Sequence, residues 1–105
     1  MIIEIRTKTK NVKKILDELT KCYWRFYKNE LGDLFFIYTY YDDVGYEYNT
    51  LIPIRAKNSG TLEVKICKCY FERFIHGIFD YVIEDVRECI KEYVDDIEKE
   101  VETNE

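Results

Sequence analysis

The feature that most constrains this chain is a long apolar stripe in its C-terminal third. Eight apolar side chains recur there at intervals of three or four residues, the spacing of one face of an α-helix. Ile75, Val86 and Ile97 are eleven residues apart. A repeat of about 3.67 residues per turn keeps a stripe on one side of a nearly straight helix. The pattern predicts one helix over residues 71–102, with the stripe Ile75, Phe79, Val82, Val86, Ile90, Tyr93, Ile97 and Val101.

Such a helix is about 48 Å long at 1.5 Å per residue, whereas residues 1–70 packed as a sphere are only about 25–30 Å across. We therefore expect residues 84–102 to overhang the body as a dimerisation helix that pairs with its copy in a homodimer. The alternatives are a helix that breaks at Gly77 and folds back onto its own sheet, or an end that frays. The predicted dimer interface is Phe79, Val82, Val86, Ile90, Tyr93 and Ile97.

The rest of the chain alternates between short apolar segments and turn signals. Segment 34–41 is apolar on both faces, which is typical of a central strand covered on both sides. Pro53 lacks an N–H donor and so places its strand at an edge or a bulge. We predict strands at 2–6, 23–28, 34–41, 46–55 and 61–70, and a helix at 10–21 that begins after a Thr9 or Asn11 cap.

This order of elements, β-α-β-β-β-β-α, predicts the fold class. Because short turns join adjacent strands, the strands should pair antiparallel. Segregated helices and an antiparallel sheet define an α+β protein. We therefore expect a single α+β domain over residues 1–105, with an antiparallel sheet of four to five strands and a long C-terminal helix.

The composition is that of a folded chain with an excess of acid. Hydrophobic residues make up 47% of it, and 16 Lys and Arg against 21 Asp and Glu leave a net charge of −5. These values exclude a disordered chain and argue against a globally basic nucleic-acid binder. No segment has the 18 or more apolar residues of a membrane span, and the first ten residues do not resemble a signal peptide. We expect a cytoplasmic protein that does not contact membranes.

The negative charge gathers on the predicted C-terminal helix. Residues 71–105 hold four Lys and Arg and 12 Asp and Glu, a net −8, whereas residues 1–70 hold 12 and nine, a net +3. A row of carboxylates at four-residue spacing is either a solvated helix face or a surface that attracts a basic partner. Asp42, Asp43 and Glu47 form a second acidic patch in a turn, which we expect to add to the partner-binding surface. The row, called here the acidic ridge, comprises Asp80, Glu84, Glu88, Glu92, Asp96 and Glu100.

Nothing in the sequence predicts catalysis or metal binding. Cys67 and Cys69 form an isolated C-x-C, whereas zinc sites use paired C-x₂₋₄-C units, and Cys22, Cys89 and His76 stand at no standard spacing. His76 has no Ser or Cys at motif spacing to activate. We predict a protein that is not an enzyme and has no metal or cofactor. The cysteines are either small buried side chains or partners in a disulfide, between strand and helix or between the Cys89 residues of two subunits.

The predicted strands are rich in aromatic residues, which suggests a second function. Residues 32–40 (GDLFFIYTY) resemble the third-strand motif of RNA-recognition domains, whose aromatic side chains stack on bases. The leading basic residue of that motif is absent, Asp33 interrupts it, and the order of elements differs. Nucleic acid is therefore not the expected partner. The alternative function is a nucleic-acid-binding regulator that uses this sheet face with Lys8, Lys10, Lys13 and Lys14.

The acidic helix, the small α+β body and the bias toward Tyr, Ile, Lys and Glu resemble accessory proteins of viruses that infect hot-acid archaea. In size, composition and layout the whole chain is similar to the anti-CRISPR family of archaeal rudiviruses that acts on type I-D effectors. The resemblance implies a dimeric, non-enzymatic viral inhibitor in the host cytoplasm that binds an effector subunit through an acidic surface. We therefore predict a protein-binding inhibitor of a basic host complex that handles nucleic acid.

Overall fold

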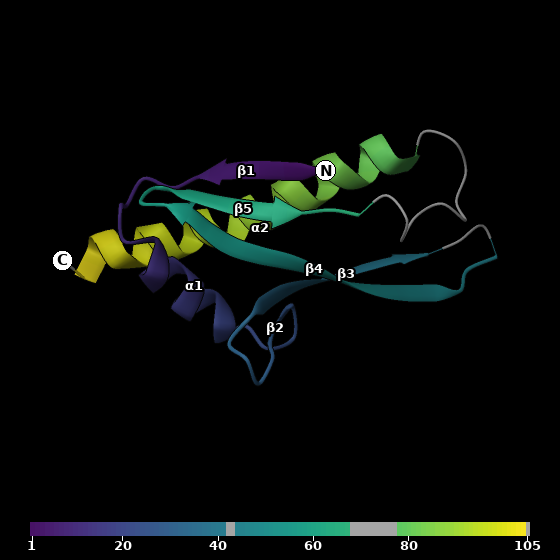
Figure 1. Cartoon of the computed structure of the whole chain (residues 1–105), viewed down its shortest axis with the longest axis horizontal. Helices are drawn as coiled ribbons and strands as arrows, with labels where there is room; N and C mark the ends of the chain where they lie inside the picture. Colours follow the sequence, from purple (N-terminus) through teal and green to yellow (C-terminus); the bar gives the residue numbers. More distant parts are fainter. Residues whose placement is uncertain (42–43, 68–77, 105) are drawn as a thin grey trace.

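Five strands and two helices make up the fold, in the order that the sequence predicts (Figure 1). The computed structural model describes residues 1–41, 44–67 and 78–104. The α+β class, the antiparallel sheet and the long C-terminal helix are confirmed. The elements are β1 (Ile2–Arg6), α1 (Val12–Thr20), β2 (Phe26–Lys28), β3 (Leu34–Tyr41), β4 (Glu47–Asn58), β5 (Thr61–Lys65) and α2 (Ile78–Asn104).

The strands form one antiparallel sheet in the order β1-β5-β4-β3-β2. Strands β4 and β5 are joined by a two-residue turn in which Gly60 has a φ of +96°, a conformation that glycine adopts without a steric penalty. A bulge between Ala56 and Asn58 precedes this turn. Strands β1 and β2 are the edges, and α1 connects them across the sheet.

Both helices lie on one face of the sheet. The hydrophobic core fills the space between the helices and the sheet. Alternate strand residues such as Ile3, Phe36 and Leu62 point inward and are buried, while their neighbours point to the other face. In α1 the residues Val12, Ile15 and Leu19 are buried. The side chain of Asn11 caps α1 by accepting a hydrogen bond of 3.3 Å from the backbone N–H of Lys14, which confirms one of the two predicted caps.

Helix α2 lies along the sheet, so the predicted overhang is wrong. Val82, Val86, Ile90 and Ile97 are at most 8% exposed and share one core cluster with the strands. Half-buried Tyr93 packs edge-on against Phe26, with ring centroids 5.2 Å apart. These side chains are therefore already covered by their own chain and do not form a free stripe for a second helix.

The overhang was predicted because residues 1–70 were assumed to pack as a sphere. The molecule measures 47 × 25 × 23 Å, because β3 and β4 are eight and 12 residues long. A helix of 27 residues, about 40 Å, fits along that length. The side chain of Phe79 and the backbone at Gly77 lie outside the described residues. The homodimer itself stays a prediction, but α2 does not supply its interface through this stripe.

Two further expectations about the sheet are corrected. Strand β4, which contains Pro53, is the middle strand and not an edge, and the bulge that was the other alternative lies between Ala56 and Asn58 and not at Pro53 itself. Its pairing with β5 begins only at Ile54, so Pro53 lies at the end of that ladder and pairs with Phe35 on the β3 side. The predicted central strand 34–41 is β3, but helices cover one of its faces, since Phe35 and Ile37 on the other face are partly exposed.

The burial of α2 predicts a large loss of stability when its apolar side is cut back. Ile90→Ala leaves a cavity between α2 and the sheet, and we expect the free energy of unfolding to fall by about 2–5 kcal/mol. The measurement is urea denaturation followed by circular dichroism. Tyr81→Ala, at a side chain that is 66% exposed on the same helix, is the control and should change stability by less than about 1 kcal/mol. Equal losses in both variants would contradict the packing described.

Candidate functional site

The acidic ridge lies on the outer side of α2. All six of its side chains are exposed. Residues four apart on an α-helix are offset by about 40°, so the row winds slowly around the helix. Its middle members, Glu88 and Glu92, lie opposite the buried stripe. The ridge therefore runs about 30 Å along the surface from Asp80 to Glu100.

Arg87 and Lys21 are two basic neighbours that interact with the ridge. Arg87 donates a hydrogen bond of 3.2 Å to Glu84 within the helix. Beyond the end of α1, a hydrogen bond with Glu18 raises the pKa of Lys21, and the charge of Glu100 adds to that rise. Exposed pairs of this kind contribute little to stability. The ridge keeps its excess of negative charge.

The second predicted acidic patch is described only in part. Asp42 and Asp43 lie outside the described residues. Glu47 is exposed at the start of β4 and accepts a hydrogen bond of 3.2 Å from the hydroxyl of Tyr41, which raises the pKa of that tyrosine. Glu47 thus belongs to the β3–β4 hairpin, a different element from the ridge.

Beneath the ridge, Asp85 ties α2 to the sheet. Its carboxylate accepts a hydrogen bond of 2.7 Å from the hydroxyl of Tyr38 in β3, and the thiol of Cys89 lies 3.9 Å from its other oxygen. Burial raises the pKa of Tyr38 far above its usual range, and the hydrogen bond to Asp85 adds to the rise. Burial and the same carboxylate also raise the pKa of Cys89. Both groups are therefore protonated at neutral pH, and the cluster holds α2 in place without providing a nucleophile.

A second carboxylate, Glu98, serves the fold in a way that the sequence analysis missed. It is 5% exposed, and both of its oxygens lie 3.0 Å from the backbone nitrogen of Lys8 in the β1–α1 connection. A buried carboxylate needs such donors, because an unpaired charge in the core is strongly unfavourable. One feature of the sequence could have indicated that Glu98 is buried. It lies next to Ile97, on the apolar side of the helix, and does not belong to the acidic ridge. Glu98 therefore has a structural role, which is to hold α2 against the β1–α1 connection. The exposed ridge carboxylates do not make this contact.

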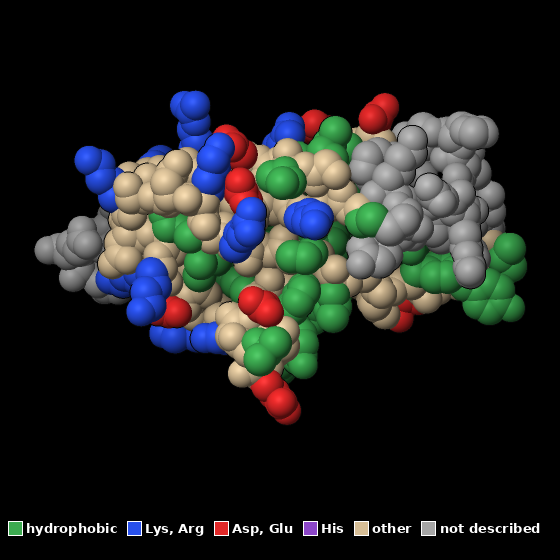
Figure 2. Space-filling model, viewed as in Figure 1, with side chains coloured by type: hydrophobic (Ala, Val, Ile, Leu, Met, Phe, Trp, Pro, Cys, Tyr) green, Lys and Arg blue, Asp and Glu red, His purple; other side chains and the backbone are tan. Residues whose placement is uncertain are grey.

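The opposite side of the molecule is the open face of the sheet, and it carries an apolar row. Tyr27, Phe35 and Pro53 are direct cross-strand neighbours on β2, β3 and β4. The row continues through Lys65 of β5 to Ile2 of β1, which are paired. In Figure 1 the strands pass in front of α2, and Figure 2 shows hydrophobic side chains in the middle of this face with Lys and Arg around them.

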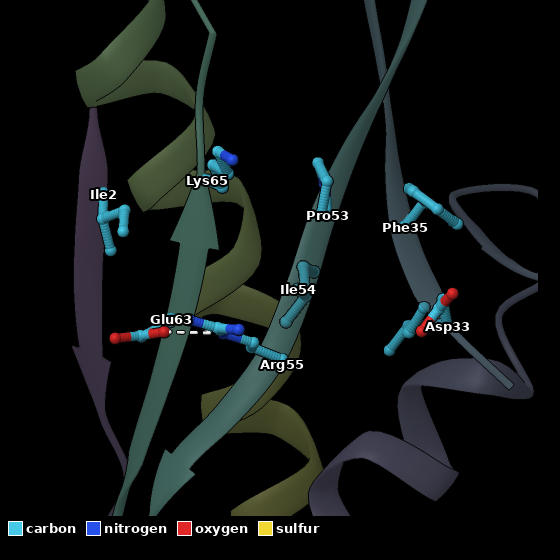
Figure 3. Close-up of a pocket in the computed structure, with 9 residues that line it drawn as sticks. Ile2, Asp33, Phe35, Pro53, Ile54, Arg55, Glu63 and Lys65 are labelled. Atoms are coloured by element: carbon cyan, nitrogen blue, oxygen red, sulfur yellow. Dashed lines mark hydrogen bonds and ion pairs between the residues drawn. The ribbon is translucent and has the colours of Figure 1, made fainter.

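A charged row runs beside the apolar row, and a shallow hollow lies along the two. Arg55 donates a hydrogen bond of 2.8 Å to Glu63, and Lys57 forms an ion pair with Glu4. The hollow has a volume of about 340 Å³. Figure 3 shows Ile2, Lys65, Pro53 and Phe35 across one level of it, and Glu63, Arg55 and Asp33 across the next.

The aromatic residues of the RNA-type motif do not share one face. Phe36 and Tyr38 are buried in the core beneath the helices, whereas Phe35 lies on the open face with Tyr27, their ring centroids 6.3 Å apart. The predicted basic residues Lys8, Lys10, Lys13 and Lys14 are exposed in and before α1. The structure thus separates the two halves of the proposed nucleic-acid surface more than the sequence suggested.

Three of the four cysteines, Cys22, Cys67 and Cys89, lie within the described residues. Cys22 and Cys89 are free thiols, so no disulfide joins a strand to α2, while Cys67 is disulfide-bonded. Cys69 and His76 lie outside the described residues. Among residues 1–41, 44–67 and 78–104, no three His, Cys, Asp or Glu side chains converge as metal ligands. In the same residues, no helix has the length and apolar character that crossing a bilayer requires.

The fold and its surfaces define a two-layer α+β protein with an acidic helix side and an open sheet side. Comparisons with protein families, with curated proteins and with solved structures find no match to this chain. The functional hypotheses therefore rest on the two surfaces described above. The resemblance to anti-CRISPR proteins stays a prediction.

The burial of Tyr38 and its hydrogen bond to Asp85 predict a loss of stability at alkaline pH. Because the pKa of Tyr38 is higher in the folded chain than the unfolded value of about 10, its contribution is fully present below that pH and is lost as the pH rises beyond it. We expect the urea midpoint to fall above about pH 10, and to fall less steeply in Tyr38→Phe. Tyr81→Phe is the control at an exposed tyrosine. The same alkaline slope in all three proteins would contradict this assignment.

Proposed function

We propose that this chain is a non-enzymatic protein-binding inhibitor whose acidic ridge docks on a basic partner. The partner class that fits is a host protein or effector-complex subunit that handles nucleic acid. The resemblance to the anti-CRISPR family makes a type I-D CRISPR effector the first partner to test, with the inhibitor acting in the cytoplasm of an archaeal host.

The observation that carries the proposal is the division of α2 into two independent sides. The inner side is used by the core, through Val86, Ile90 and the buried Glu98. The ridge carboxylates take no part in that packing, since all six are exposed. Like charges four residues apart repel by about 0.2–0.5 kcal/mol per pair, so the row weakens the helix slightly. A stable fold does not require these residues, and a docking role accounts for them.

The chemistry of the ridge suits a partner that binds nucleic acid. Such a partner neutralises phosphates with clustered Lys and Arg. The ridge offers negative charges about 6 Å apart along the axis of a rigid helix, because four residues rise 6 Å. Opposite charge over such a length accelerates encounter and excludes acidic competitors.

The alternative, a nucleic-acid-binding regulator, has weaker support. The open face carries acids as well as bases, and Arg55 and Lys57 are already paired with Glu63 and Glu4. A phosphate-binding surface needs clustered positive charge that is not neutralised in this way. Titration of labelled RNA and DNA at low salt separates the two functions, since tight binding would favour the alternative.

Charge reversal tests the ridge directly. The triple variant Glu88→Lys, Glu92→Lys and Asp96→Lys should weaken binding to a purified type I-D effector complex at least tenfold, because the charge of the docking surface changes sign. The matched control reverses three exposed acids outside both predicted acidic patches, Asp17→Lys, Glu30→Lys and Asp33→Lys, and should retain binding. Biolayer interferometry at about 150 mM salt measures the affinity, and circular dichroism checks the fold. If the ridge variant binds like the wild-type chain, the ridge is only a solvated surface.

A further inference from the structure

We propose that the open face of the sheet is the interface between two copies of this chain, which pack face to face with their helices outside. This goes beyond the inhibitor function, since it concerns self-association and the side of the molecule away from the ridge. In the described part of the predicted helix stripe, Val82, Val86, Ile90 and Ile97 are buried within one subunit. The sheet face keeps an apolar surface that no described helix covers.

The apolar row supplies the contact. Three of its members or neighbours remain well exposed in the single chain: Ile2 at 52%, Tyr27 at 48% and Leu51 at 45%. Leu51 pairs with Ile37, two residues along the strands from the Phe35–Pro53 pair. An antiparallel sheet that faces water normally carries polar residues on that face. Apolar side chains on four of the five strands, with β5 contributing Thr61, Glu63 and Lys65 instead, indicate a face that is covered in the working protein.

Charge favours a second copy as the occupant. The row beside the apolar row has both signs, with Arg55 paired to Glu63 and Lys57 paired to Glu4. A nearly neutral face can meet itself across a twofold axis without like-charge repulsion. Packing through the helices would instead bring two acidic ridges together. Packing through the sheets places the ridges on opposite outer sides, where their repulsion is smallest.

The dimensions are sufficient for a stable interface. Stable dimers bury about 800 Å² on each partner. Five strands spaced about 4.8 Å apart give a sheet about 24 Å wide, and the molecule extends 47 × 25 Å along its two longer axes. Two sheets that pack face to face interdigitate their side chains at a separation of about 10 Å. The hollow of about 340 Å³ then accommodates apolar side chains of the second copy.

Sedimentation equilibrium of the full chain tests the proposal. The wild-type protein should have twice the chain mass of 12.8 kDa at micromolar concentration. The double variant Ile2→Lys and Leu51→Lys places four lysines in the interface and should raise the dissociation constant at least tenfold. Tyr81→Lys and Leu31→Lys change apolar residues that are even more exposed, on α2 and in the β2–β3 turn, and should leave the dimer intact.

Hydroxyl-radical footprinting of the unmodified chain supplies a test that needs no variant. Oxidation of Tyr27 and Phe35 should fall as the protein concentration rises through the dimerisation range. Oxidation of Tyr81 and Trp24, which lie outside the interface, should stay constant. A wild-type chain that is monomeric at about 100 μM would overturn the proposal. So would a dimer that resists the open-face substitutions, or one in which Tyr81 is protected instead of Tyr27. None of these three results bears on partner binding by the ridge, which the charge-reversal variants measure separately.

Discussion

The packing of α2 along the sheet is the interaction on which the rest of the structure depends. Its buried side chains, from Val82 to Ile97, form one core cluster with residues of β1, β3, β4 and β5. Each Å² of apolar surface that this contact removes from water contributes about 25 cal/mol to stability. It also sets the orientation of the helix, and therefore where its polar side faces.

Two buried polar contacts refine this orientation. Asp85 accepts a hydrogen bond from the hydroxyl of Tyr38, and Glu98 accepts one from the backbone N–H of Lys8. The first ties α2 to β3, and the second ties it to the connection between β1 and α1. Each would be unfavourable if its partner were lost, because a desolvated polar group without a hydrogen bond destabilises the fold. Together they restrict α2 to one rotation about its axis, which keeps the ridge on the outer side.

The result is a molecule with two dissimilar sides. The helix side carries the acidic ridge and suits a basic partner, as proposed for the inhibitor function. The sheet side is apolar and nearly neutral, and suits a second copy. Because the core separates the two sides, both contacts can form at once. A face-to-face dimer would present two ridges, which raises the effective affinity for a partner with two basic sites.

The sequence by itself determined the order of the elements, a polar cap at Thr9 or Asn11 before α1, and the position of charge along α2. These follow from local propensity and periodicity, which act over a few residues. Only the tertiary structure decided what covers the stripe of α2, that the strand of Pro53 is central, and that Glu98 is buried while Glu88 is exposed. These outcomes depend on which distant strands pair and on the elongated shape of the sheet. Periodicity identifies the side of a helix that must be buried, but the partner that buries it is set by contacts between residues far apart in the chain.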